Sequence, residues 1–363
     1  MIVGILSVLL FAYLILLGTT IIGWNKTDLA LKNNNQQFVT VIIPFRNEQN
    51  NLQSTIASVL KNNPDFFELL LIDDHSIDQS YNICKSFESK HVNISVLKLD
   101  KTTGKKAAIK LGVEHAKAEI ILQTDADCIV PHNWIQNMSR SLEVSTNLLI
   151  GPVKVKTEEQ GWNWLNQVEF CFLQAFTGAS ANFNQPLMAN GANLMYRKSI
   201  YWEYQKSQLG KEYASGDDQF LLNYIKRKSA KSINYVKNQG AIVATSFSSK
   251  WSEITAQRTR WAKKKSNSNL GETLIGTVLF LAQFLIPTCI LLTIFDSNYL
   301  MFLWATLLIK VFGELFLVFI TMNFFGINRL KYIPIFSFVY PIFLSNIITL
   351  AAFRKNKWKG REI

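Results

Sequence analysis

The sequence predicts an α/β domain with a parallel sheet, flanked by transmembrane helices. Hydrophobic residues make up 48% of the 363 residues and charged residues 18%, whereas soluble chains carry about 25% charged residues. The apolar residues gather near the two ends of the chain, and short β-branched runs alternate with helical stretches between them. Because Gly and Pro are scarce and aromatic residues are plentiful, a disordered or fibrous protein is excluded.

The first element is a transmembrane helix over residues 1–24. Ile2–Gly23 contains no charged residue and is long enough to cross a bilayer. A cleaved signal peptide is the alternative, but the start of the chain lacks a basic residue and no small-residue cleavage site follows the apolar run. The sequence therefore favours a membrane anchor before the polar segment.

The polar segment, residues 38–248, forms the α/β domain. Apolar runs typical of buried strands lie at 39–44, 69–72, 94–99 and 120–122, and helical stretches lie at 51–62, 79–89 and 105–117. This order predicts a parallel sheet with right-handed crossovers. Since ligands of such sheets bind beyond the carboxyl ends of the strands, acidic residues that follow the strands are the candidate site residues.

One acidic pair follows the second predicted strand and another follows the fourth. Asp73 and Asp74 could accept hydrogen bonds from a ribose hydroxyl or a base N–H, although a turn that caps the next helix explains them equally well. Asp125 and Asp127 lie two residues apart, and two carboxylates so placed can hold a divalent cation that still binds phosphate oxygens. Such a cation would neutralise the charge that develops on a diphosphate leaving group.

A third acidic pair, Asp217 and Asp218, begins a helical stretch later in the chain. Asp218 could act as the general base that deprotonates an acceptor hydroxyl. A helix N-cap is the alternative, and it explains one of the two aspartates better than both. The turn Asn190–Asn193 gives no functional signal of its own.

Residues 249–270 are predicted to form an amphipathic helix at the membrane surface, because two tryptophans and an isoleucine recur at helical spacing. Arg258 and Arg260 could clamp a pyrophosphate, and Trp261 could stack on a sugar ring. The alternative is that basic residues before a membrane helix follow the positive-inside rule. That rule explains the lysines that follow well and the tryptophan poorly.

Residues 271–353 contain about three further membrane segments, and a basic tail follows at 354–363. Lys310 and Glu314 interrupt the middle segment, and their four-residue spacing predicts an ion pair on one helix face. The pair also suggests a transporter, but four helices are few for that role and the large polar domain would have no explanation.

Charge and cysteine usage narrow the partners and the compartment. The formal net charge of +12 indicates an anionic partner: lipid headgroups, nucleotide phosphates or nucleic acid. Nucleic acid is disfavoured because no recognition module accompanies the charge. The four cysteines lie far apart without a C-x-x-C pair, which excludes a zinc ribbon or a small disulfide scaffold and fits a reducing compartment.

The order of these motifs resembles the membrane-bound members of glycosyltransferase family 2. The resemblance rests on Val41–Glu48, Asp73-Asp74, Gly104-Lys105, Asp125-Ala-Asp127, Asp217-Asp218 and Gln257-x-x-Arg260-Trp261. It implies a GT-A nucleotide-diphospho-sugar transferase fold with a Rossmann-like mixed sheet. The tail residues 357–361 are similar to the W-x-G-R ending of some lipid-directed members.

The resemblance also implies roles for individual residues. The nucleotide-sugar-binding positions would be Pro44, Arg46, Glu48, Asp73, Asp74, Lys105 and Asp125. Asp125 and Asp127 would bind Mg²⁺ or Mn²⁺, with Asp127 the more direct ligand. Asp218 would be the base, preceded by Asp217. The acceptor and the diphosphate would be served by Gln257, Arg258, Arg260 and Trp261.

The expected activity is inverting transfer of a sugar from a nucleotide-diphospho-sugar, with UDP as the expected nucleotide, to a hydroxyl of a lipid or lipid-linked saccharide. One base without a nucleophile partner implies inversion. A processive polysaccharide synthase is the alternative, although such enzymes carry more membrane helices and often a regulatory domain. A non-catalytic membrane scaffold fits the intact set of carboxylates less well.

The expected location is the cell membrane, in cell-envelope synthesis, with several crossings and the catalytic domain on the cytoplasmic side. Three full crossings after residue 270 would place the basic tail outside, against the positive-inside rule. Because Pro334 and Pro341 can break a helix, residues 332–353 are expected to bend and return the tail to the cytoplasmic side.

Overall fold

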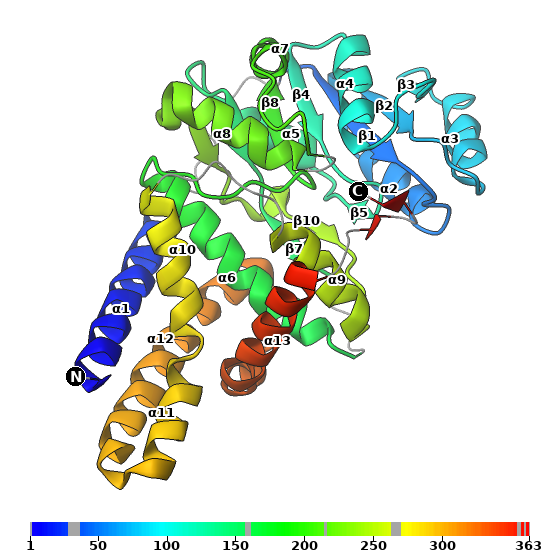
Figure 1. Ribbon diagram of the computed structural model, residues 1–363. Helices are drawn as coiled ribbons and strands as arrows, with labels where there is room; N and C mark the ends of the chain where they lie inside the picture. The colour runs from blue at the N-terminus through cyan, green and yellow to red at the C-terminus, as the bar shows by residue number, and fades with distance from the viewer. Residues whose placement is uncertain are drawn as a thin grey trace. The chain divides into compact units, whose positions relative to one another are not determined.

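The computed structural model describes residues 2–27, 37–156, 161–213, 216–262, 270–353, 357–358 and 361–362. The chain forms two compact units, coloured by residue number in Figure 1. The α/β unit comprises Thr27–Lys156 and Ser180–Ser246, and the helical unit comprises Met1–Lys26, Thr157–Ala179 and Phe247–Ile363. Residues 157–179 thus belong to the helical unit, although the sequence analysis placed them inside the α/β domain.

A seven-stranded sheet forms the centre of the α/β unit. Its strands, in spatial order, are β3 (Ile94–Lys98), β2 (Phe67–Asp73), β1 (Val39–Phe45), β4 (Ile120–Gln123), β8 (Leu194–Arg197), β6 (Leu148–Ile150) and β9 (Ile233–Tyr235). The first four are parallel, as the strand–helix–strand pattern predicts. Because β8 runs antiparallel to both β4 and β6, the sheet is mixed, and the architecture implied by the family resemblance is confirmed.

Helices and a small second sheet complete the α/β unit. The helices are α2 (Leu52–Val59), α3 (Ser80–Glu88), α4 (Lys105–His115), α5 (Trp134–Arg140), α7 (Lys198–Lys206) and α8 (Asp217–Ser229), with short 3₁₀ turns η1 (Pro64–Phe66), η2 (Ala230–Ser232) and η3 (Gln239–Ala241). The second sheet consists of β5 (Cys128–Ile129), β10 (Val243–Thr245) and β7 (Val153–Val155).

Burial on both faces explains the continuous apolar runs of the central strands. Every residue of β1 and β2 is buried, as expected where helices cover a parallel sheet. Helix α4 packs closely on β1, because a Cβ atom at Gly112 would lie 2.8 Å from Ile42 Cγ2. This close approach fixes α4, and with it Lys105 at its amino end.

The helical unit contains the apolar helices and the helix with the Q-x-x-R-W residues. Its elements are α1 (Ile2–Lys26), most of α6 (Asn163–Asn182), α9 (Trp251–Ala262), α10 (Leu270–Ala282), α11 (Leu285–Phe295), η4 (Ser297–Tyr299), α12 (Leu300–Phe325), η5 (Leu330–Tyr332), α13 (Ile333–Phe353) and the pair β11 (Lys357–Trp358) and β12 (Arg361–Glu362). The lysines at 263–265 lie outside the described residues.

Three helical segments of the described chain are long and apolar enough to cross a membrane: Ile2–Lys26, Ser297–Phe325 and Leu330–Phe353. The consecutive helices α10 and α11, which meet at a 45° bend, would make a fourth span if the two together form one. The apolar segments predicted at both ends of the chain are therefore present as helices.

The predicted bend in residues 332–353 is wrong. The structure has one continuous helix, α13, over Ile333–Phe353. Pro334 lies at the second position of that helix, where a backbone N–H has no partner within the helix in any case, and Pro341 is accommodated inside it. The bend lies earlier, between α10 and α11.

The predicted pairing of Lys310 with Glu314 is confirmed. Both side chains are buried, and the Glu314 carboxylate also accepts hydrogen bonds from the hydroxyls of Tyr13 (2.6 Å) and Ser337 (2.9 Å). Lys310 Nζ lies 3.4 Å from Gln283 Oε1. Since a polar group in an apolar bundle needs a partner within the protein, this cluster ties α1, α12 and α13 together.

Candidate active site

The candidate site begins at the carboxyl ends of β1 and β2. Phe45 and Asp73 pair in register, so the residues that follow them emerge side by side. Arg46 Nη1 donates a hydrogen bond to the Asp74 backbone oxygen over 3.1 Å, and the Asn47 amide donates to Ser76 Oγ over 3.1 Å. The two loops therefore hold each other in place.

Pro44 contributes to this edge through the backbone. It lies inside β1 opposite Ile72, two residues beyond Ile42, the last residue that pairs with β4. Because Pro lacks an N–H, it is tolerated where one neighbouring ladder has ended. The predicted residue is thus positioned at the end of the central strand.

Asp73 is buried and incompletely hydrogen-bonded. Its Oδ1 accepts the Ser76 amide over 2.9 Å, whereas its buried Oδ2 has no hydrogen-bond partner among the described residues. Such an atom is costly unless a ligand satisfies it. The neighbouring Asp74 carboxylate lies 3.9 Å from Arg46 Nη1 and 3.3 Å from His75 Nδ1. These contacts show that a simple helix cap does not account for both aspartates, and their nucleoside role stays a prediction.

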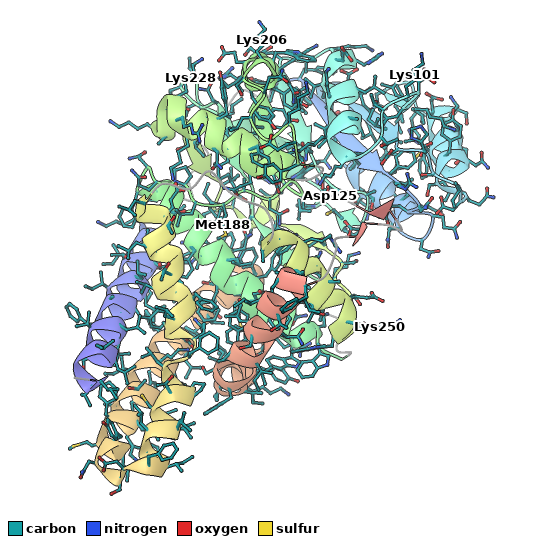
Figure 2. All side chains as sticks on the ribbon, in the orientation of Figure 1. Lys101, Asp125, Met188, Lys206, Lys228 and Lys250 are labelled. Atoms are coloured by element: carbon teal, nitrogen blue, oxygen red, sulfur yellow. The ribbon has the colours of Figure 1, made fainter. Side chains whose placement is uncertain are left out.

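The D-x-D residues lie in the turn between β4 and β5. The Cys128 amide donates to the Asp125 backbone oxygen over 3.2 Å, and Thr55 Oγ1 donates to the Ala126 backbone oxygen over 2.8 Å. Asp125 is marked in Figure 2. Burial, together with the negative charges of Asp125 and Glu48, raises the pKa of the Asp127 carboxyl to about 6. Carboxylates crowded in this way favour a bound cation.

The donor set fits a magnesium or manganese ion shared with a substrate. The described residues contain no group of three or more His, Cys, Asp and Glu side chains arranged around a metal position. Mg²⁺ is commonly held by one or two carboxylates together with substrate phosphates. Asp125 and Asp127 can supply the protein part of such a site, and a diphosphate can supply the remaining oxygens.

Lys105 connects the D-x-D turn with the later acidic pair. Its Nζ donates a hydrogen bond to Asp125 Oδ1 over 2.6 Å. Burial disfavours the charged form of Lys105, but the charges of Asp125, Asp217 and Asp218 outweigh it and hold the pKa of the lysine above its ordinary value. The ammonium group therefore remains positive where a diphosphate would gather negative charge.

The loop before β8 joins Asp217 and Asp218 to this group. The Gly191 amide donates to Asp218 Oδ2 over 3.1 Å, and Gln123 Nε2 lies 3.4 Å from Asp217 Oδ2. A Cβ atom at Gly191 would lie 3.2 Å from Lys105 Nζ and 3.8 Å from Asp218 Oδ2. Lys105 and Asp218 thus lie beside one glycine, and Gln123 links Asp217 to the same turn.

The role of this glycine turn was not predicted from the sequence. The turn is held in place by Asn193. The buried side-chain amide of Asn193 accepts a hydrogen bond from Trp134 Nε1 and donates hydrogen bonds to the backbone oxygens of Pro152 and Ala241. The only local signal in the sequence was the Asn190-Gly-Ala-Asn193 turn itself. It could not be interpreted alone, because the partners of Asn193 are far away in the sequence.

The remaining predicted residues lie on α9 of the helical unit. Arg258 is buried and donates to Glu169 Oε2 through Nε (2.8 Å) and Nη2 (2.6 Å). Its Nη1 donates to Gln257 Oε1 over 2.7 Å, and its guanidinium lies 4.4 Å from the ring centroid of Trp261. Arg260 is half-buried. Arg258 is therefore held within the helical unit by an ion pair with Glu169.

Comparison with known proteins shows what the chain is similar to. Residues 40–205 match the model of the family described as glycosyl transferase family 2. The chain is 25% identical over 232 residues to the glycosyltransferase GlyG of Streptococcus pneumoniae, an alignment that covers 59% of this chain and 76% of GlyG.

A second relative and a solved structure extend this result. An undecaprenyl-phosphate 4-deoxy-4-formamido-L-arabinose transferase of Pseudomonas savastanoi is 26% identical over 150 residues, which are 40% of this chain and 44% of the relative. The structure of the mannosyltransferase PcManGT from Pyrobaculum calidifontis, in complex with GDP-Man and Mn²⁺, superimposes with a TM-score of 0.59 at 13% identity and covers 98% of this chain and 100% of that one. This likeness supports the fold.

Proposed function

Because the chain belongs to glycosyltransferase family 2, we propose that it transfers one sugar from a nucleotide-diphospho-sugar to a hydroxyl of a lipid or lipid-linked saccharide. The observation that carries the proposal is the group around Gly191, where Lys105 lies beside Asp125 and close to Asp218. A cation for the leaving diphosphate and a base for the acceptor are both needed in such a transfer, and these residues supply both.

In the proposed mechanism the diphosphate lies against Lys105 and the D-x-D turn. A divalent cation bound by Asp125 and Asp127 would neutralise charge on the leaving group. Asp218 accepts the proton of the acceptor hydroxyl, and the acceptor oxygen forms a bond to the anomeric carbon as the bond to the diphosphate breaks. A single displacement of this kind inverts the anomeric configuration.

The donor nucleoside is proposed to bind at the ends of β1 and β2. The unpartnered Oδ2 of Asp73 can accept an N–H or O–H from the base or ribose. We infer a UDP-sugar as the donor and Mg²⁺ or Mn²⁺ as the cofactor. The structural neighbour contains GDP-Man and Mn²⁺, so GDP-sugars are the first competitors to test.

The acceptor is proposed to be presented by the membrane. The apolar helices would keep the protein beside an amphiphilic acceptor, and the Pseudomonas relative is named for transfer to undecaprenyl phosphate. We place the α/β unit on the cytoplasmic side, where nucleotide sugars are made.

A donor screen tests this function. Protein purified in detergent is incubated with acceptors that carry a free hydroxyl, diacylglycerol and a polyprenyl-linked saccharide, and with a panel of UDP- and GDP-sugars, and release of nucleoside diphosphate is measured. The expected result is release with one donor class that requires both the acceptor lipid and a divalent cation. If no donor gives release above a blank without protein, the proposal is wrong.

A further inference from the structure

Lys106, the neighbour of Lys105 in the first turn of α4, fastens the segment that leads to the acidic pair. Its Nζ donates hydrogen bonds to the backbone oxygens of Gly210 and Tyr213, both over 2.7 Å. A lysine ammonium has three N–H donors, and two of them are used on one short segment. The two adjacent lysines therefore serve different partners, one at the D-x-D turn and one at this segment.

The same ammonium group contacts α8 directly. Lys106 Nζ lies 4.7 Å from the ring centroid of Phe220, and Phe220 is in the first turn of α8, beside Asp217 and Asp218. Tyr213 stacks on the same ring at 5.3 Å with an interplanar angle of 27°. Lys106 thus holds both the segment before α8 and the first turn of α8.

The backbone at Gly210 packs closely against the ring of Phe220. Its φ of +72° is in the left-handed region, and a Cβ atom there would lie 2.4 Å from the ring of Phe220. A side chain at this position would displace either the ring or the segment. The backbone oxygen that Lys106 binds is therefore set in a narrow space against α8.

We infer that Lys106 is a positioning residue that fixes the base Asp218 relative to Lys105 and the D-x-D turn. The inference rests on the proposed function for the role of Asp218. Its physical basis is that a displacement of about 1 Å in a reacting group can cost about a hundredfold in rate. Removing the two hydrogen bonds and the ring contact frees the first turn of α8 to move.

The test compares Lys106→Met with Lys106→Arg and with Lys110→Met. Lys110 is an exposed residue of the same helix, so its replacement matches the change in charge and side-chain length. Steady-state transfer rates and hydrogen–deuterium exchange of residues 207–213 and 216–220 are measured for each variant. Hydrogen–deuterium exchange reports whether Lys106 holds these segments, even before a sugar donor has been identified.

The expected result for Lys106→Met is a fall in kcat of about tenfold or more, a donor KM within about twofold of the wild type, and faster exchange in both segments. Lys106→Arg, which keeps the donors, should recover part of the rate, and Lys110→Met should behave as wild type. If Lys106→Met matches Lys110→Met in both rate and exchange, the inference is overturned.

Two further outcomes are informative. An equal loss of donor binding in Lys106→Met would show a role in the donor site instead and would also overturn the inference. Wild-type protein without transfer activity would contradict the proposed function, and the exchange comparison would still decide whether Lys106 holds the segment. Should Lys106→Met fail to fold, Lys106→Gln, which keeps one N–H donor group, is measured in its place.

Discussion

Lys105 Nζ lies 2.6 Å from Asp125 Oδ1, and this ion pair joins the first turn of α4 to the turn after β4. Burial and the negative charges of Asp125 and Glu48 raise the pKa of the Asp127 carboxyl to about 6, so its charged form is held at a cost. A cation at the D-x-D turn would relieve that cost. We therefore expect Asp127 to be the more direct metal ligand.

The first prediction concerns metal removal. A chelator should abolish transfer, and Asp127→Ala should lower the rate by more than about 10- to 100-fold, the loss typical of residues that only support a metal ligand, without rescue by excess Mg²⁺ or Mn²⁺. The measurement is nucleoside diphosphate release across a metal titration. Asp65→Ala, at an exposed position outside the site, is the control and should keep wild-type rates. Full activity in the chelator would remove the metal from the mechanism.

The second prediction separates the base from the donor site. Asp218→Asn should reduce turnover by about 10² to 10⁴-fold, the usual contribution of a general base, and should leave nucleotide-sugar binding nearly unchanged. Calorimetry gives the binding constant and product formation gives the rate. If binding is lost together with turnover, Asp218 belongs to the donor site or to the fold.

The third prediction concerns the buried pair of Arg258 and Glu169. Glu169→Gln should lower the free energy of unfolding by about 3 to 5 kcal/mol, because it leaves a buried charge unpaired. The double variant Glu169→Gln with Arg258→Met should regain part of that loss. Thermal unfolding in detergent measures both.

A matched control and a competing outcome sharpen this test. Glu253 forms an exposed ion pair with Lys250 at the start of α9, the helix that carries Arg258. Glu253→Gln should change the free energy of unfolding by less than about 1 kcal/mol. If Glu169→Gln is equally mild while Arg258→Met raises the donor KM, Arg258 binds the diphosphate as the sequence analysis proposed.

The fourth prediction is the side of the membrane on which the tail lies. Tyr332 stacks on Trp164, and Phe343, well inside α13, packs on Trp251. Trp162 contacts both tryptophans, so the start of α13 packs against one cluster of aromatic side chains. Such clusters are typical of membrane interfaces. We therefore expect α13 to lie at the membrane interface and not to cross the bilayer. The tail then remains on the cytoplasmic side, although the helix is not bent.

Cysteine labelling in intact cells checks this placement. The four native cysteines are buried, so Lys357→Cys should report on the tail alone. It should resist a membrane-impermeant reagent, whereas Asn298→Cys, in the exposed turn between α11 and α12, should react. Modification at position 357 would show that α13 crosses the membrane fully.

The sequence was most informative where each signal was local. Four parallel strands could be located because each is a short apolar run, and the acidic residues directly follow two of them. The strands β6, β8 and β9 were not predicted, because they lie outside the regular strand–helix alternation that marked the equally short β4. Their existence depends on pairing with partners far along the chain.

Several long-range contacts within each unit could not be predicted for the same reason. Gly191, Lys106 and Glu169 act through partners that are distant in the sequence, and no local pattern marks them. Proline misled the analysis in α13, since Pro334 lies where a helix does not need its N–H. The bend between α10 and α11 lies just before Pro287, whose missing N–H cannot bond to the Gln283 carbonyl and so interrupts a continuous helix; this proline was the local signal that was overlooked.

Mass spectrometry of the acceptor lipid, after reaction with the identified donor and a divalent cation, tests the proposed sugar transfer most directly. We expect wild-type protein to add a single sugar to the lipid, and Asp218→Asn to add none while still binding the donor. A lipid that stays unmodified while nucleoside diphosphate is released, or one that carries a long polymer, would contradict the proposed transfer.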